Sequence, residues 1–478
     1  MDAEAFAEHL EFPRGRGHAP PASFSGTAGG AACGDLIRLD LRVEGDRVAD
    51  AGFDASGCGA AVAAGSAAVA LASGATVLGA ARIGTGEVAA ELGGLSPGKL
   101  HAADLAADAL HQALGAAAAA GAAVAADSAR TLVAMSGGVD SAVAALLVQR
   151  AGRAAVAVTL ELWRDPANDA EASCCSAHAV RLARSVAHRM GLAHFTLDLR
   201  AEFAAGVVTP FLADHAAGLT PNPCVRCNGN VRLDAMLAFA DRLGAADLAT
   251  GHYARLTPDG LLRAAADPGK DQAYMLAALV PASLARLRFP LGELHKPRVR
   301  ELARAAGLPV ADKRESQDLC FLAGTGKSAF LARHGGLRER PGAILDRGGR
   351  TVGRHRGQHL FTIGQRKGLG VAGPEPLYVL ATDAGSNRVL AGPREALETR
   401  AVTLRGARLH RAAREVDGVR LRYHAPSLAC RVVEQDPQPP RGRLELELLE
   451  PADGAAPGQT ACLLRGDVVV GWGTIART

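Results

Sequence analysis

The sequence predicts an α/β fold: a parallel, doubly wound sheet domain, preceded by a small α+β module and followed by β-rich modules. Between residues 131 and 250, short apolar runs typical of buried strands alternate with runs of helical periodicity, as expected for a parallel sheet. Beyond about residue 340, glycine, proline and short β-patterned runs take over, and the last module is predicted to be a β-barrel. A chain of 478 residues is longer than a single hydrophobic core ordinarily supports, so several domains are expected. Domains are therefore expected over residues 1–125, 126–338, 339–398 and 399–478.

The first module is expected to combine strands with helices of small residues. Apolar and polar residues alternate over 36–44, LIRLDLRVE, which predicts a half-buried strand. GDRV supplies a turn, and a second strand leads into FDASGCG. Helices are predicted over AAVAAGSAAVALASG and over roughly residues 98–114. Residues 115–127, rich in alanine and glycine, are interpreted as a linker or a fraying helix end.

The central sheet is expected to contain the strands TLVAM, AVAVTLEL and HFTLDL. The helical runs AVAALLVQRAG and SAHAVRLARSVAHRMG connect these strands, and RLGAADLATGHYARL adds a further helix–strand unit. Short strands of the later modules are predicted in YVLATD, RVLAGP, AVTLRGARLH, VRLRYH, LELELLE and ACLLRGDVVVGWGTIA.

Charge is unevenly distributed along the chain, although the net charge is only +4. Residues 1–130 carry 8 Lys and Arg against 15 Asp and Glu, whereas residues 286–370 carry 18 against 7. This asymmetry indicates a polyanionic partner for the second half, and a solvated basic face is the alternative. The sequence offers no long apolar membrane segment and no basic, apolar leader. We therefore expect a cytoplasmic protein with reduced thiols and no membrane partner.

The sharpest motif is Ser136-Gly137-Gly138-Val139-Asp140-Ser141, which lies between a predicted strand and a predicted helix. Its glycines allow a tight turn, and its backbone amides, its hydroxyls and the helix start form a cradle for a pyrophosphate group. The lysine of a Walker A loop is absent, so the implied chemistry differs from γ-phosphoryl transfer. Asp140 is expected either to bind Mg²⁺ or to cap the helix.

Three cysteines form the second candidate site. Cys224 and Cys227 lie in TPNPCVRCN, a Pro-rich loop before a predicted helix, where Arg226 and the helix start favour thiolates. Cys320 follows in SQDLCF, close to two basic residues. Structural zinc normally takes four ligands, and only three are evident. A metal site, a redox pair and a nucleophile remain open on this pattern alone.

Six motifs in order resemble the tRNA-specific 2-thiouridylase (MnmA) family over about residues 130–478. They are SGGVDS, TPNPCVRCN, TGHY, KDQ, SQDLCF and TIGQRKGLG. SGGVDS alone is similar to the PP-loop of the N-type ATP pyrophosphatases, which have a HUP-like fold and split ATP between the α- and β-phosphates. Another adenylylating PP-loop enzyme is therefore the alternative activity.

The resemblance implies ATP-dependent 2-thiolation of the wobble uridine of tRNA through an adenylylated uridine. By the resemblance, Cys320 carries a persulfide and Cys227 is the nucleophile that releases the sulfur through a disulfide. ATP, with Mg²⁺, is expected at Ala134, Met135, Ser136, Gly137, Gly138, Val139, Asp140, Ser141, Leu160 and Gly251. The positions that match tRNA contacts are His252, Lys270, Asp271, Gln272, Arg422, Tyr423 and Gln459.

The resemblance also implies partners: tRNAs with Lys, Glu and Gln anticodons, and a cysteine desulfurase or a sulfur-carrier protein. The small central domain, 339–398, is expected to bind tRNA. Many family members have aspartate where this chain has Cys224. Cys224, Cys227 and Cys320 therefore form a possible set of three ligands for a 4Fe–4S cluster, as an alternative to persulfide relay.

The first module resembles the IscU/NifU-type iron–sulfur scaffold over roughly residues 20–115. Cys33, Asp35, Cys58 and His101 match its ligand positions, whereas Ala102 occupies the position of the family's third cysteine. Two interpretations follow: a working sulfur or cluster donor, or a degenerate docking module. A non-catalytic cluster carrier is a further hypothesis for the whole chain. The remaining cysteines are expected to be packing residues or incidental thiols: Cys174, Cys175, Cys430 and Cys462.

Overall fold

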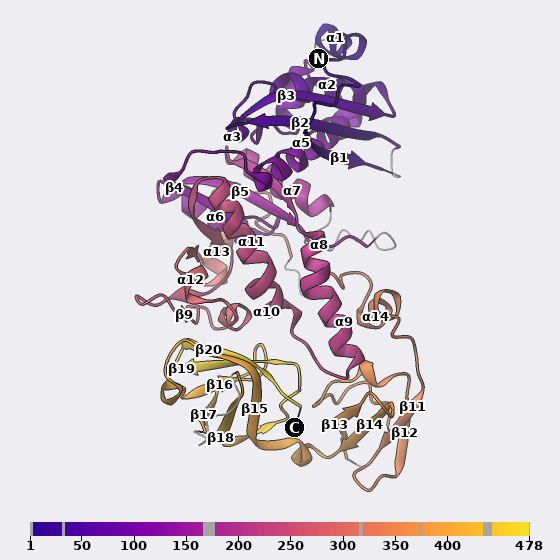
Figure 1. The fold of residues 1–478 in the computed structure, drawn as a ribbon, viewed down its shortest axis with the longest axis vertical. Coiled ribbons are helices and arrows are strands. Elements are labelled where there is room, and N and C mark those ends of the chain that lie inside the picture. Colours follow the sequence, from indigo (N-terminus) through magenta and orange to yellow (C-terminus); the bar gives the residue numbers. More distant parts are fainter. Residues whose placement is uncertain are drawn as a thin grey trace. The chain divides into compact units, whose positions relative to one another are not determined.

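A computed structural model describes residues 3–30, 34–165, 177–314, 319–371, 375–433 and 442–477. The chain forms two compact units, each assembled from separate stretches of sequence. The first unit comprises Met1–Arg200, Asp234–His252 and Arg286–Phe321. The second comprises Ala201–Leu233, Tyr253–Ala285 and Leu322–Thr478. Figure 1 labels the elements of both units. The boundaries predicted between the four domains remain predictions.

The first unit begins with a three-stranded antiparallel sheet in the order β1-β2-β3. The alternating sequence forms β2 (Leu36–Glu44), and the strand that follows the turn is β3 (Arg47–Ser56), as predicted. The sequence pattern missed β1 (Phe24–Gly29), a strand of small residues at the sheet edge. The helices of this part are α1 (Ala3–Glu11), α2 (Gly59–Ala72), α3 (Val77–Ala80), α4 (Thr85–Glu91) and α5 (Leu100–Ala120).

The long helix α5 corrects the predicted linker. It continues through residues 115–120, which were expected to fray, and ends at Gly121 with a φ of +125°. Alanine is the strongest helix former, so the alanine-rich run extends the helix once both of its sides are covered. One side contacts β1 and β2, and the other contacts β6 (Ala193–Asp198). Gly115 allows this approach, because a Cβ there would lie 1.9 Å from the Thr196 carbonyl oxygen.

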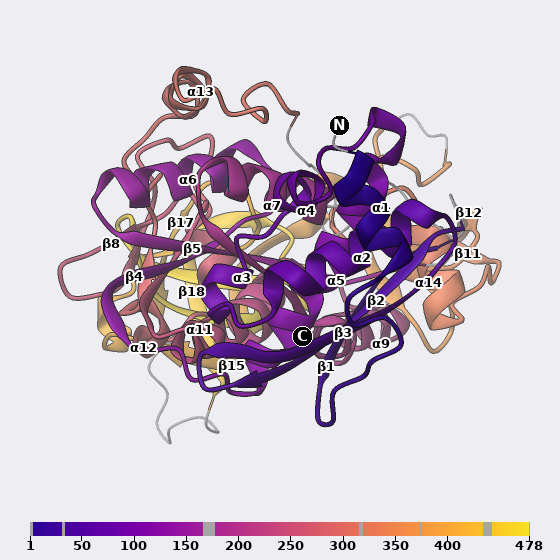
Figure 2. The same ribbon diagram turned by 90° about the horizontal axis from the view of Figure 1, so that it is seen from above.

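A parallel five-stranded sheet forms the rest of the first unit, with strand order β10-β7-β4-β5-β6. Its crossover helices α6 and α7 lie on the same side of β4 and β5 (Figure 2). The order reverses at β4, whose neighbours β5 and β7 lead away in opposite directions, and ligands bind at such a switch point. The elements are β4 (Asp127–Ala134), α6 (Val139–Arg150), β5 (Ala154–Glu161), α7 (Ala177–Arg189), α11 (Leu233–Arg242), β7 (Ala245–Thr250), β10 (Leu287–Arg288) and α13 (Lys296–Ala305).

Charged side chains cross-link α5 and α7 inside the first unit. Arg184 of α7 is 2% exposed, and its guanidinium donates a hydrogen bond to the carboxylate of Asp108. Arg181 Nε lies 3.0 Å from the other carboxylate oxygen of Asp108. Burial raises the pKa of Asp108, while the two arginines act in the opposite direction. Removing one partner of such a buried pair leaves an uncompensated charge, so this contact fixes α5 against the parallel sheet.

The second unit begins with a helical segment and includes a four-stranded sheet in the order β12-β11-β14-β13. The helical segment includes α8 (Arg200–Phe203), α9 (Thr209–Ala216) and α10 (Pro223–Cys227), with α12 (Pro281–Leu284) and α14 (Lys327–Gly335) further along the chain. The small sheet consists of β11 (Gly342–Leu345), β12 (Thr351–His355), β13 (Tyr378–Asp383) and β14 (Arg388–Gly392).

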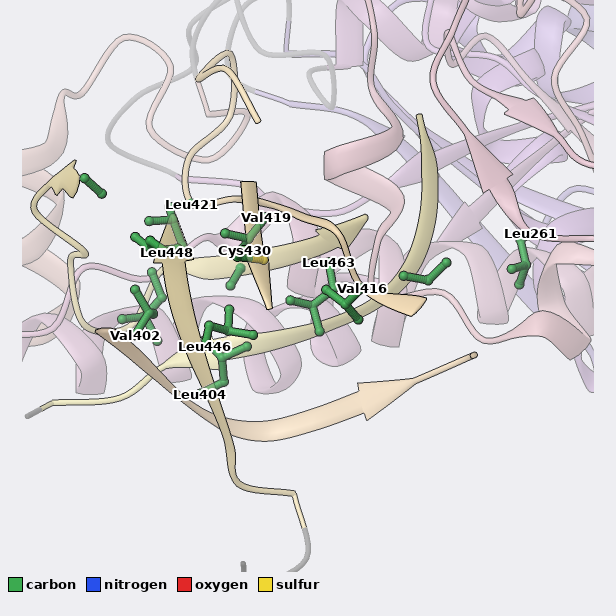
Figure 3. Packing of buried hydrophobic residues seen from close by; sticks show 14 residues of the cluster. Leu261, Val402, Leu404, Val416, Val419, Leu421, Cys430, Leu446, Leu448 and Leu463 are labelled. Atoms are coloured by element: carbon green, nitrogen blue, oxygen red, sulfur yellow. The ribbon is translucent and has the colours of Figure 1, made fainter. Parts of the chain in front are cut away.

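The C-terminal strands close into the predicted barrel. The pairing of β15 with both β18 and β20 closes a ring of six strands, in the order β15-β18-β17-β16-β19-β20. Leucines of LELELLE alternate inward along β18, where Leu446 pairs with Val402 of β15 in the core of Figure 3. The strands are β15 (Glu398–Leu409), β16 (Gly418–Arg420), β17 (Leu428–Val432), β18 (Leu444–Asp453), β19 (Thr460–Arg465) and β20 (Val468–Ile475), extended by β8 (Arg255–Leu256) and β9 (Leu262–Arg263).

The predicted fold class is confirmed by this arrangement: a parallel α/β sheet, a small α+β module before it, and a barrel at the end. Within the described residues, no helix combines the length and the apolar character that crossing a membrane would take.

Candidate active site

The SGGVDS motif forms the connection between β4 and α6, at the switch point of the parallel sheet. Gly138 caps α6, which begins at Val139 rather than near Ser141 as expected. The Ser136 amide donates to the Ser141 hydroxyl oxygen at 3.1 Å, and that hydroxyl donates to the Gly138 carbonyl oxygen at 3.1 Å. Ser141 therefore ties the two ends of the loop together. The loop presents the start of α6 to the carboxyl edge of the sheet, where an anion is stabilised.

The end of β7 lies directly against this loop. A Cβ at Gly251 would lie 2.7 Å from the Ser141 amide nitrogen and 2.9 Å from the Asp140 carbonyl carbon. Only glycine fits so close to backbone atoms, so TGHY and SGGVDS belong to one site. Next to it, the Thr250 hydroxyl and His252 Nδ1 lie 2.8 Å apart. Leu160, near the end of β5, which pairs with the other side of β4, is 9% exposed.

Two lysines that the motif search missed contact the phosphate loop. Lys296, the first residue of α13, places its Nζ 2.7 Å from both carboxylate oxygens of Asp140 and is 8% exposed. Lys313 Nζ donates to the Gly137 carbonyl oxygen at 2.9 Å. The phosphate loop has no lysine of its own, but these two lysines contact it from positions far along the chain. The available signal was the Lys-Pro pair at residues 296–297, since proline is favoured in the first turn of a helix, within the basic stretch 286–370.

The CxxC segment is a helix rather than the expected loop. Pro223 opens α10, and the Asn222 side chain caps it by accepting a hydrogen bond from the Val225 amide at 3.2 Å. Cys224 and Cys227 are three residues apart and so lie on the same face of the helix. Cys224 is half-buried, whereas Cys227 is 8% exposed.

Cys320 belongs to the first unit, whereas Cys224 and Cys227 belong to the second. Cys320 is half-buried at the start of a turn that runs through residues 320–325 and includes the buried Phe321. Two other thiols have the packing role that the sequence suggested: burial raises the pKa of Cys430 to about 11 and that of Cys462 to about 12. Their thiolates are therefore scarce at neutral pH. Cys174 and Cys175 lie outside the described residues.

The KDQ motif connects to the barrel through its aspartate. Asp271 is 6% exposed; its carboxylate accepts hydrogen bonds from the Ala265 and Ala273 amides, both at 3.1 Å. The other carboxylate oxygen accepts from Arg420 of β16 at 2.9 Å. Asp271 therefore organises the loop, and Gln272 also helps, because its side-chain oxygen accepts from the Tyr253 amide at 3.0 Å. Lys270 is half-buried beside them.

The remaining tRNA candidates of the second unit lie on the barrel. Arg422 donates to the Ile363 carbonyl oxygen at 3.0 Å, and the Tyr423 ring lies 6.0 Å from that of Tyr274. Gln459 Nε2 donates to the Thr220 carbonyl oxygen at 2.9 Å, just before the cysteine helix. The barrel thus supports the segment that carries Cys224 and Cys227. His252 is the one candidate of this set that belongs to the first unit.

The N-terminal module gathers three possible metal ligands. Asp35, Cys58 and His101 bring one ligand atom each to within 4.8 Å of the others. The Cys58 amide and thiol donate to the Asp35 carboxylate at 2.7 and 3.1 Å, and His101 Nε2 lies 2.9 Å from it. The Cys58 amide, and after it the His101 ring and the Cys58 thiol, lower the pKa of Asp35.

The orientation of His101 suits a ligand. Its Nδ1 lies 2.9 Å from the Gly98 carbonyl oxygen, which accepts the Nδ1 proton and turns Nε2 toward Asp35 and Cys58. The donor set of thiolate, imidazole and carboxylate fits iron or zinc. Ala102, in the position of the scaffold family's third cysteine, is fully buried. Cys33, the fourth predicted ligand, lies outside the described residues.

Four families of known protein domains match consecutive parts of the chain. Residues 2–143 match the NifU-like N terminal domain family, and residues 129–324 match the tRNA methyl transferase HUP domain family. Residues 328–393 match the tRNA methyl transferase PRC-barrel domain, and residues 406–475 match the aminomethyltransferase beta-barrel domain. Fold and site thus define a HUP-domain protein of the PP-loop class with a fused NifU-like module.

Curated relatives identify the family. The bifunctional protein NifU/MnmA of Rubrobacter xylanophilus is 44% identical over 484 residues, covering 98% of this chain and 97% of that protein. The tRNA-specific 2-thiouridylase MnmA of Roseiflexus castenholzii is 41% identical over 375 residues, covering 73% of this chain and all of that protein. The chain belongs to the MnmA family of tRNA sulfurtransferases, in the form that carries an N-terminal NifU-like domain.

Proposed function

We propose that this chain converts the wobble uridine of tRNA to 2-thiouridine at the expense of ATP. The observation that carries the proposal is the SGGVDS loop at the switch point of the sheet, held against Gly251 and Lys296. The placement suits ATP cleavage between the α- and β-phosphates, because the helix start and two lysines surround one anion-binding edge. Family membership supports tRNA as the substrate.

In the activation step, the C2 carbonyl oxygen of the uridine attacks the α-phosphorus of ATP. The bond between the α- and β-phosphates breaks, pyrophosphate leaves, and AMP remains attached to the uridine. We assign the polyphosphate to the backbone of residues 136–141 and to Lys296. Ala134, Met135, Leu160 and Gly251 would border the nucleotide. Mg²⁺ would accompany ATP, with Asp140, the carboxylate within the loop motif, as its proposed ligand.

In the sulfur step, the terminal sulfur of a persulfide on Cys320 attacks C2 of the activated uridine, and AMP leaves. The Cys227 thiolate then attacks the Cys320 sulfur and breaks the S–S bond, so that the sulfur stays on the uridine. Both cysteines end as a disulfide, which an external dithiol reduces. A cysteine desulfurase or a sulfur-carrier protein would supply the persulfide.

An iron–sulfur version of the sulfur step rests on the three thiols. Cys224, Cys227 and Cys320 would then hold a 4Fe–4S cluster, which when bound supplies sulfide to the activated uridine. The presence of Cys224 on the same helix face as Cys227 favours this version. The protein's own contribution is otherwise the same in both versions: it activates the uridine and excludes water from it.

The substrates proposed are tRNAs that read Lys, Glu and Gln codons. Positions proposed to contact them are His252, Lys270, Asp271, Gln272, Arg422, Tyr423 and Gln459, together with the basic central module, 339–398. The excess of positive charge over residues 286–370 supports phosphate contacts. Asp271 would act by shaping the loop, since its carboxylate is already bonded to the protein.

Incubation of the purified chain with ATP, Mg²⁺, a persulfide source and unmodified tRNA tests the proposal. We expect pyrophosphate release that depends on the tRNA, and 2-thiouridine detected by mass spectrometry of the digested RNA. A tRNA with cytidine at the wobble position is the matched control and should give neither product. The assignment would be refuted if the tRNAs that read Lys, Glu and Gln codons all gave neither pyrophosphate nor 2-thiouridine.

We further propose that the N-terminal module holds iron or an iron–sulfur cluster through Cys33, Asp35, Cys58 and His101. The convergence of three of these ligands supports a second function in metal or sulfur delivery. Bound to these residues, the metal would supply a site for assembling or storing sulfide.

Cobalt binding checks this site without relying on activity. Co²⁺ added to the full-length protein should produce thiolate-to-metal absorption that Cys58→Ser or His101→Ala strongly weakens. Cys430→Ser, which removes a buried barrel thiol, is the control and should leave the spectrum unchanged. If Cys58→Ser keeps the full cobalt spectrum, the N-terminal module is a docking module and not a metal site.

A further inference from the structure

A cavity of about 460 Å³ in the second unit shares no residue with the phosphate loop, the three cysteines or the N-terminal metal ligands. The start of α14 forms one side of it, through Lys327 and Ser328. The short turn Gln358–Leu360 forms another side, through His359, and Leu337 adds an apolar surface. A ligand in this cavity would therefore bind apart from the proposed thiolation chemistry.

The sequence at this helix start resembles the end of a Walker A loop but lacks the rest of that motif. It reads Gly-Thr-Gly-Lys-Ser over residues 324–328, with Phe321 in the position of the first glycine, and a turn rather than a strand precedes the helix. Gly326 has a φ of +77°, and no side chain of the described residues caps the nine-residue helix. The amides of the first turn are therefore available to an anion.

Three basic groups lie close together beside this helix start. Lys327 is half-buried, while His359 and His215 of α9 are 8% and 4% exposed. Burial, and after it the charges of Lys327 and His359, lower the pKa of His215 to about 3; burial also lowers the pKa of Lys327. Within the described ranges, none of the three forms an ion pair with a carboxylate. An anion would stabilise basic groups that are crowded together and poorly hydrated.

The carboxylate on the cavity wall is paired elsewhere. Glu339 is exposed, and its Oε1 lies 3.0 Å from a terminal guanidinium nitrogen of Arg356. Arg356 thus neutralises Glu339 at the surface, and the side of the cavity that Lys327 and His359 form keeps an excess of positive charge. That side suits a ligand with negative charge at one end.

The burial of these groups favours a terminal phosphate over an internal phosphate of RNA. An internal phosphodiester carries one charge and has a sugar on each side, so exposed arginines contact it more readily than buried groups do. A phosphate monoester carries a charge of about −1.5 to −2 at neutral pH and has three free oxygens. It can therefore enter a cavity and meet several donors at once.

We infer that this cavity binds the terminal phosphate group of a phosphate monoester, with inorganic phosphate as the minimal ligand. The phosphate oxygens accept hydrogen bonds from the first-turn amides of α14 and from the Ser328 hydroxyl. Lys327 and His359 neutralise its charge, and the rest of the ligand lies along Leu337. Two sources share this chemistry: a small phosphate ester and the 5′ end of a tRNA. The inference does not depend on the proposed function.

Lysine labelling tests the inference in the full-length protein. Brief acetylation followed by peptide mass spectrometry gives a rate for Lys327 itself, so phosphate bound at the SGGVDS loop does not obscure the result. Inorganic phosphate and methyl phosphate should slow the labelling of Lys327 roughly tenfold, because an ammonium group held by phosphate seldom releases its proton. Lys99, exposed in the N-terminal module, is the internal control and should react at an unchanged rate. Dimethyl phosphate, a diester, should protect neither lysine.

Transfer RNA distinguishes the two sources. If the RNA end is the ligand, tRNA with a 5′ phosphate should protect Lys327, and the same tRNA with a 5′ hydroxyl should not. Protection by phosphate and methyl phosphate, with no difference between the two tRNAs, assigns the cavity to a small ester. The inference is wrong if no ligand protects Lys327. It is equally wrong if both tRNAs protect it alike while phosphate and methyl phosphate do not, since RNA would then only cover the cavity.

Two variants check the assigned contacts through the phosphate concentration that gives half-maximal protection of Lys327. His359→Asn should raise this concentration about tenfold, through the loss of a charged partner. Ser328→Ala, an exposed change that should not disturb folding, should raise it severalfold. Arg338→Met removes an exposed charge that does not line the cavity and should leave it unchanged. Parent-like protection in both His359→Asn and Ser328→Ala would show that phosphate binds elsewhere.

Discussion

Cys320→Ser is expected to abolish 2-thiouridine formation while leaving the activation of tRNA intact. The serine hydroxyl accepts no persulfide, so sulfur transfer should fall by on the order of a thousandfold or more. ATP and tRNA should still react until each active site has released one pyrophosphate, and then stop. Rapid-quench measurement of pyrophosphate, with mass spectrometry of the RNA, detects this burst without product.

The two cysteines of α10 should respond differently. Under persulfide relay, Cys227→Ser loses thiolation like Cys320→Ser, because the thiolate that cleaves the persulfide is gone. Cys224→Ser should keep most of its activity, since the relay uses only the thiols of Cys227 and Cys320. Loss of activity in all three variants, together with loss of iron from anaerobically purified protein, would instead establish the cluster version. Cys462→Ser, a barrel thiol whose pKa burial raises to about 12, is the inert control.

Local patterns predicted much of the fold, because they depend only on neighbouring residues. Alternation of apolar residues identified β2 and the core strand β18, and a glycine-rich turn between strand and helix identified the phosphate loop. Composition failed at residues 115–120, where alanine and glycine suggested a linker. Those residues are helical because α5 packs between β1 and β6. This packing depends on the tertiary structure, which local composition does not reveal.

The candidate site shows the same limit. SGGVDS and TGHY could be recognised as motifs, but their contact at Gly251 depends on the strand order. Lys296 lies 156 residues from Asp140 along the chain and has no motif of its own. Arg184 and Asp108 are separated by 76 residues and by a predicted domain boundary. Pairings over such separations depend on topology, which spacing in the sequence does not encode.

Lys296→Met is expected to lower the rate of tRNA-dependent pyrophosphate release by roughly a hundred- to a thousandfold. Loss of one preorganised cationic group beside a developing phosphate charge has about this effect. The variant also leaves Asp140 without the ammonium group that contacts both of its carboxylate oxygens at 2.7 Å. Since a lysine that is 8% exposed lies in a poorly solvated place, the melting temperature should fall as well.

Activity and stability can be separated at this pair. Asp140→Asn combined with Lys296→Met removes both charges and should regain much of the lost stability, because no uncompensated charge remains. If Lys296 or its partner Asp140 acts on ATP, the double variant stays at least as slow as Lys296→Met even when its melting temperature recovers. Arg298→Ala, on the exposed side of the same helix, is the matched control and should change neither quantity. A double variant that recovered its rate along with its stability would show that Lys296 only holds α13 against α6.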